Sequence, residues 1–119
     1  MTLQSAHVGG IVRTIPNARK GLSVGAAGTT IDLTSVTADE GDATVTNLVN
    51  RWVILAARGG DITIMRGAAP GTAGTGFVIK SGEREEFFVE QGQSTTLGAK
   101  AGSTITLDIL YDTQPVGQT

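Results

Sequence analysis

The stretch "NRWVILAARGGDITIMRG", residues 50–67, holds two apolar segments separated by a glycine-rich turn signal. The first segment, Trp52 to Ala57, is apolar on both faces of an extended chain, as in a strand that is covered on both sides. The second places Ile62 and Ile64 on one face and Asp61, Thr63 and Met65 on the other. This period of two is typical of a strand with one buried face. The stretch therefore predicts two consecutive β-strands.

The same alternation recurs outward from this stretch. In "STITLDILYD", Ile105, Leu107 and Ile109 share one face of an extended chain. Apolar spacing typical of a helix is not sustained in any window, although a single helical turn at "TADEGDA" stays open. Shorter strands are predicted in "TTIDLTSV" (29–36), "ATVTNLV" (43–49), "GFVIKS" (76–81) and "EEFFVEQ" (85–91).

Composition supports an all-β fold. The 119 residues include 17 glycines, and turn signals such as "KSGE", "EQGQ" and "AKAGS" separate the predicted strands. Seven or eight short strands in a chain of this size predict a single small β-sandwich or jelly-roll-like domain over residues 23–119.

Residues 1–22 differ from the rest of the chain. They mix "GG", "IPN" and "ARKG" with isolated apolar residues, which is too irregular for a core strand and too apolar for a free tail. We expect an extended N-terminal arm here. Its docking site is either its own sandwich or a neighbouring subunit, and the sequence leaves both open.

Charge is unevenly distributed, although the net charge is only −2. Residues 1–31 carry three cations and no acid, whereas residues 32–119 carry six cations and eleven acids. Three dispersed cations are too few for a nucleic-acid-binding surface, which needs a dense basic face. They suit an arm that lies on an acidic neighbouring surface, and a charge distribution that is only solvated is the alternative. Three further arginines flank the two central strands, where their planar guanidiniums suit partner carboxylates. The candidate partner-binding residues are Arg13, Arg19, Lys20, Arg51, Arg58 and Arg66.

The loop "GAAPGTAGTG", residues 67–76, resembles a phosphate-binding loop only in its glycines. It has no lysine after the last glycine and leads into "FVIK", whereas a Walker loop opens a helix. Its glycine order also differs from the dinucleotide fingerprint. We interpret it as a mobile surface connection between two strands.

Catalytic and metal-binding chemistry is not expected. The chain has no cysteine, which excludes disulfides, thiolate zinc sites and cysteine nucleophiles. The single histidine, His7, lies in the arm without a recognisable nucleophile. The acidic group Asp39, Glu40 and Asp42 lacks the ligand spacing of an EF-hand. The acidic group Glu83, Glu85 and Glu86 consists of neighbouring charges typical of a solvated strand end. We predict a protein that is not an enzyme and holds no cofactor or metal.

Two further classes are disfavoured. Aromatic residues make up only 4% of the chain, which speaks against stacking of bases or sugars. The N-terminus lacks the apolar core of a signal peptide, and no apolar run approaches the roughly 18 residues of a membrane span. We expect a soluble protein made in a cytoplasm, with neither nucleic acid nor membrane as partner.

The layout of residues 51–111 resembles that of a known protein class. Its order is a strand, a short turn, a strand ending in "RG", a loose glycine-rich loop, "FVIKSGE", "FFV" and "AGSTITLDILY". It is similar to the small capsid decoration (cement) proteins of tailed bacteriophages. The resemblance implies a homodimer or homotrimer, made in the host cytoplasm, that sits on the outside of the virion and bridges subunits of the major capsid protein. The alternative is a receptor- or carbohydrate-binding β-domain of a phage tail, a fibre or a secreted protein.

Overall fold

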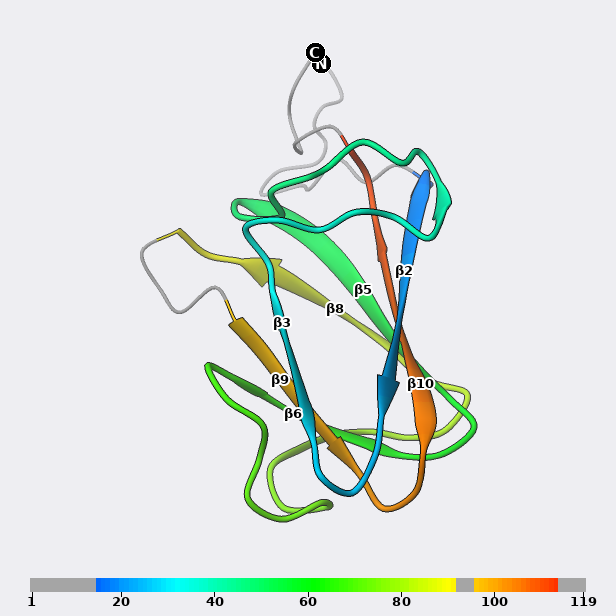
Figure 1. The fold of residues 1–119 in the computed structure, drawn as a ribbon, viewed down its shortest axis with the longest axis vertical. Coiled ribbons are helices and arrows are strands. Elements are labelled where there is room, and N and C mark those ends of the chain that lie inside the picture. The colour runs from blue at the N-terminus through cyan, green and yellow to red at the C-terminus, as the bar shows by residue number, and fades with distance from the viewer. Residues whose placement is uncertain (1–14, 92–95, 114–119) are drawn as a thin grey trace, which may run out of the picture.

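Two antiparallel sheets make up the fold in the computed structural model, which describes residues 15–91 and 96–113 (Figure 1). None of the described residues is helical, which confirms the predicted all-β class. The five-stranded sheet has the order β4 (Glu40–Gly41), β2 (Ala18–Val24), β10 (Ile105–Tyr111), β5 (Arg51–Arg58), β8 (Arg84–Val89). The four-stranded sheet has the order β3 (Thr29–Asp32), β9 (Thr96–Ala101), β6 (Ile62–Arg66), β7 (Phe77–Ile79).

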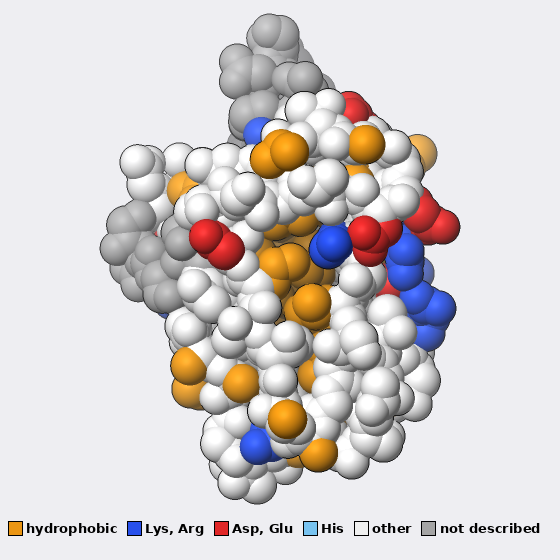
Figure 2. Space-filling view, viewed as in Figure 1, with side chains coloured by type: hydrophobic (Ala, Val, Ile, Leu, Met, Phe, Trp, Pro, Cys, Tyr) orange, Lys and Arg blue, Asp and Glu red, His pale blue; other side chains and the backbone are white. Residues whose placement is uncertain are grey.

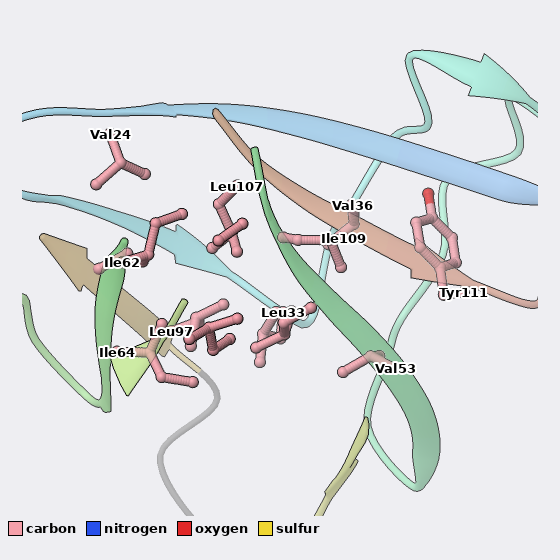
Figure 3. Close-up of a cluster of buried hydrophobic side chains, with 14 of the residues drawn as sticks. Val24, Leu33, Val36, Val53, Ile62, Ile64, Leu97, Leu107, Ile109 and Tyr111 are labelled. Carbon is pink, nitrogen blue, oxygen red and sulfur yellow. The ribbon is translucent and has the colours of Figure 1, made fainter. Parts of the chain in front are cut away.

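The predicted inward faces of β10 and β6 are confirmed. Ile105, Leu107 and Ile109 of β10 belong to the same buried core as Ile62 and Ile64 of β6 from the other sheet. Figure 3 shows Leu107, Ile109, Ile62 and Ile64 in this core. Each of these side chains is at most 7% exposed. Burial of apolar surface at about 25 cal/mol per Å² makes this layer the main source of stability.

β5 departs from the prediction of a strand covered on both sides. Its residues Val53, Leu55 and Ala57 are buried between the sheets. On the opposite face Trp52 and Ile54 stay half-buried, because no further layer among the described residues covers the outer face of the five-stranded sheet.

The predicted boundary between arm and sandwich at residue 22 is wrong. β2 begins at Ala18 and pairs with β10 over its whole length, from Ala18 opposite Tyr111 to Val24 opposite Ile105. Residues 18–22 therefore belong to the sheet, although Gly21 has a weak strand propensity. Residues 1–14, with the predicted arm, lie outside the described residues.

β9 was not expected, because "TLGAKA" reads as a turn. It pairs with both β3 and β6 in the middle of its sheet. Conversely, "ATVTNLV" forms only the isolated bridge between Val36 and Thr46, and β3 ends at Asp32 instead of running to residue 36. Asp32 accepts hydrogen bonds from the backbone and hydroxyl of Thr34, which turns the chain. The helical turn left open at "TADEGDA" is the short strand β4.

The glycine-rich loop 67–76 connects β6 to β7, as predicted, with Ile62 opposite Ile79. The chain packs onto its own sheet there and is not a free tip. The backbone at Ala68 lies so close to Gly98 of β9 that a Cβ at Gly98 would overlap it. The hydroxyl of Thr63 accepts a hydrogen bond from the amide of Gly74, and Thr63 is only 2% exposed. The loop thus covers part of the outer face of the four-stranded sheet.

Candidate interaction surface

Two of the predicted partner-binding arginines converge on one carboxylate. Arg19 of β2 lies 2.7 Å from the carboxylate of Asp108 (Nη2 to Oδ1), and Arg58 of β5 binds the same group through Nε at 2.9 Å and Nη2 at 3.2 Å. The three strands lie side by side, with Gly21 opposite Asp108. Gly21 leaves room for the guanidinium of Arg19, which would be 2.8 Å from a Cβ at that position. The side chains of Asp108 and Arg58 are 12% and 61% exposed.

The pKa of Asp108 is set by opposing effects. Burial of the carboxyl raises its pKa, but the hydrogen bonds and charges of Arg58 and Arg19 outweigh burial and lower the pKa below its usual value. Asp108 is therefore ionised at neutral pH and holds both guanidiniums on the outer face of the sheet.

The acidic group near β4 forms separate local contacts. Lys20 lies 3.1 Å from Asp39, which also accepts a hydrogen bond from the backbone of Gly21. Glu40 pairs with Arg19 at 3.2 Å, and Figure 2 shows acidic and basic side chains side by side along this edge (right). Asp42 instead accepts hydrogen bonds from Thr44 and Thr113. No three metal-ligating side chains gather among the described residues.

The remaining predicted cations have different surroundings. Arg51, the first residue of β5, donates hydrogen bonds to the backbone carbonyls of Asn47 and Asp112 and so links the start of β5 to these two segments. Desolvation lowers the pKa of Arg51. Arg66 ends β6 and lines the groove described below. Arg13 lies outside the described residues.

The second acidic group does not converge. Glu83 precedes β8, while Glu85 and Glu86 are neighbours within it, so their side chains leave opposite faces of the strand. His7 lies outside the described residues.

An apolar surface on the five-stranded sheet was not predicted. Trp52 of β5 and Phe88 of β8 are cross-strand partners whose rings meet edge to face, with centroids 5.6 Å apart. Ile54 and Leu110 are the neighbouring cross-strand pair on β5 and β10. Phe88 is 44% exposed and the other three side chains are half-buried. We call Trp52, Ile54, Phe88 and Leu110 the outer-face patch.

Charged side chains border the outer-face patch. Leu110 lies opposite Arg19, and Ile54 lies opposite Glu86. Asp108 and Arg58 occupy the same face further along β10 and β5. An apolar centre with aromatic rings and a charged border is typical of protein interfaces. The alternation of "RWVILAAR" contained the signal, since a solvated outer face normally carries polar residues at these positions.

A groove of about 320 Å³ opens between the two sheets near the end of β8. Its lining is mainly apolar and includes Leu55, Val89 and Leu97. Phe77 of β7 and Phe87 of β8 meet edge to face there with centroids 5.2 Å apart, so the two rings join the sheets. Sequence reasoning did not find this groove, because its walls come from strands that are distant in the chain.

In comparisons with known proteins, no family model, curated protein or solved structure matches the chain. None of the described segments forms a helix with the length and apolar character needed to span a bilayer.

Proposed function

We propose that this protein is a structural protein of a virion, a decoration protein with a jelly-roll-like sandwich that binds the outside of a bacteriophage head and stabilises it. The observation that carries the proposal is the outer-face patch with its charged border. The layout of residues 51–111, which resembles decoration proteins, gives the class of partner, the major capsid protein.

The outer-face patch suits docking onto another protein. Tryptophan, phenylalanine and arginine are enriched at protein interfaces, and the two aromatic side chains bury a large area with few rotatable bonds. The Trp52 and Phe88 rings support each other edge to face, and Arg58 is held by Asp108 while its side chain stays 61% exposed. Little conformational entropy is lost when such a surface binds.

Binding by many copies explains how a small surface stabilises a particle. A dimer or trimer that contacts several capsid subunits gains from effective concentration, so weak individual contacts act together. Arg19 and Lys20, which we expected to contact the capsid, are paired with Asp108, Glu40 and Asp39 within the chain. The role in capsid contact therefore passes from these two cations to the outer-face patch.

Binding to capsids tests this proposal. Purified protein is mixed with expanded capsids that lack it, and bound protein is measured after sedimentation. We expect saturable, stoichiometric binding and a higher rupture temperature of the capsids. Phe88→Glu places a charge in the outer-face patch and is expected to weaken binding at least about tenfold, the equivalent of about 1.4 kcal/mol.

Val45→Glu is the matched control. Val45 is an apolar residue, 62% exposed, that lies outside both sheets, so this variant is expected to bind like the unmodified protein. Absence of binding by the unmodified protein contradicts the proposed function. Equal binding by Phe88→Glu shows that the outer-face patch is not the contact.

One observation favours a second function, a receptor- or carbohydrate-binding domain. Trp52 and Phe88 present aromatic rings on the same open face, and aromatic rings also stack on sugars. A glycan array distinguishes the two, since specific glycan binding that is lost in Phe88→Glu supports the second function.

A further inference from the structure

The groove between the sheets is unfilled by the described residues, and its mainly apolar lining suits an apolar occupant. Its side chains include the Phe77 and Phe87 rings, and Phe77 is 47% exposed. Exposed aromatic surface of this kind costs free energy in water at about 25 cal/mol per Å². The neighbouring segment 92–95, which links β8 to β9, consists of Gly, Gln, Ser and Thr and brings no large apolar side chain.

The two terminal segments outside the described residues differ in what they offer. Residues 114–119, "QPVGQT", contain one branched aliphatic side chain. Residues 8–12, "VGGIV", contain three, and the two glycines between Val8 and Ile11 let the chain approach a wall closely. The described chain begins with Ile15, which is 89% exposed, so the apolar character of the N-terminal segment continues up to β2.

Register places the start of β2 within reach of the groove. Ala18 lies opposite Tyr111, Tyr111 opposite Val53 and Val53 opposite Phe87, so the four residues form one row across the sheet. Three strand spacings of about 4.8 Å separate Ala18 from Phe87, about 14 Å in total. Asn17 is bound to Asp42 and Thr113, so the free segment starts at Ile15, which the same register places about 15 Å from Val89 at the groove. Extended chain spans about 13 Å from Ile15 to Ile11 and about 23 Å from Ile15 to Val8, so this segment can reach the groove of its own chain.

We infer that residues 8–12 occupy this groove in their own chain, with Val8 and Ile11 packed against Phe77, Phe87 and Leu97 and Val12 at the entrance of the groove. The segment then closes the end of the sandwich and covers its exposed aromatic surface. The sequence left two docking sites open for the arm, and this inference chooses the sandwich of the same chain. The segment then has no part in capsid binding, which we assign to the outer-face patch.

Disulfide trapping tests this inference, because the chain has no cysteine of its own. Gly10→Cys leaves the three aliphatic side chains intact and is combined with Val89→Cys in the groove. The control pair combines Gly10→Cys with Leu110→Cys on the outer face of β10. By strand geometry Val89 and Leu110 both lie about 14–15 Å from Ile15, where the described chain begins, so reach alone favours neither.

We expect the pair with Val89→Cys to form an intramolecular disulfide at least about tenfold faster than the control pair, because docking raises the effective concentration. Equal rates overturn the inference. Disulfide-linked dimers overturn it as well, because they place the segment in the groove of a second copy.

A second measurement does not depend on cysteines. Ile11→Asp combined with Val12→Asp should release the segment and increase the fluorescence of an added hydrophobic dye severalfold, while unfolding stays cooperative. Thr2→Asp combined with Gln4→Asp serves as the control with the same added charge. Unchanged dye binding in the Ile11 and Val12 variant contradicts the inference, and neither result depends on capsids.

Discussion

At the scale of single residues, the most consequential contact joins Arg19, Asp108 and Arg58. They are 89 and 50 residues apart in sequence, measured from Asp108. The sequence predicted the two arginines as partner-binding residues, but a linear pattern does not show that β2, β10 and β5 are neighbours. The structure therefore changes their role, because each guanidinium is already bound to Asp108 and presents only its remaining surface.

Asp108→Asn is expected to lower the free energy of unfolding by about 1–2 kcal/mol at pH 7, because the amide loses the charge-assisted bonds to both arginines. The lowered pKa of Asp108 gives the sign of the pH effect. Its stabilisation is complete above the unfolded-state pKa near 4 and is lost as pH falls through the folded-state pKa. In thermal unfolding between pH 7 and pH 2, the melting temperature of the variant should thus fall less steeply with pH than that of the unmodified protein.

Asp61→Asn is the control, since Asp61 is exposed and its ion pair with Lys80 at 3.8 Å has little expected effect. Asp61 also accepts a hydrogen bond from the amide of Ser81, which the side-chain oxygen of asparagine can accept as well. An equally steep acid decline in Asp108→Asn and the unmodified protein would contradict the assignment.

Tyr111 gives a second test at this scale. Its side chain is 1% exposed, and its hydroxyl has no hydrogen-bond partner in the described part of the chain (Figure 3). Burial raises the pKa of this hydroxyl. Removing a buried polar group without a partner relieves a desolvation cost, so Tyr111→Phe should raise stability by about 1 kcal/mol in urea unfolding. A loss of stability would show that the hydroxyl is satisfied.

At the scale of elements, the loop 67–76 packs so closely on β9 that each limits the residues the other can contain. β9 contains Gly98 because the loop backbone at Ala68 lies against it, which leaves no space for a side chain. Gly98→Ala should therefore displace the loop or strain the sheet and cost about 3 kcal/mol, measured by chemical denaturation. Gly102→Ala is the matched control, because nothing lies within 4 Å of a Cβ there. Equal stability of the two variants would show that the loop does not pack on β9.

The same pair of elements shows what the sequence predicts and what it does not. Strands with regular alternation, such as β6 and β10, were found because one face is buried. β9 and β2 were missed because Gly98 and Gly21 are there for space, one beneath a loop and the other beside Arg19, and such steric demands leave no periodic signal. The outer-face patch was visible in "RWVILAAR", but whether a further layer covers it depends on the whole fold.

At the scale of the whole molecule, we propose separate roles for two surfaces. In this proposal the five-stranded sheet presents the outer-face patch to a partner, and the groove between the sheets receives residues 8–12 of the same chain. Truncation separates them. Deleting residues 1–14 should leave a folded protein with increased dye binding, whereas deleting residues 1–22 also removes most of β2 and should lower the melting temperature by more than 10 °C, roughly the effect of a few kcal/mol. Equal melting temperatures of the two truncated forms would contradict the role of β2.

The most direct test of the central claim is an image of capsids after incubation with the protein, by cryo-electron microscopy. We expect ordered density on the outside of the head, with Trp52 and Phe88 against the major capsid protein. Bare capsids at saturating protein, or density in which the outer-face patch faces solvent, would contradict it.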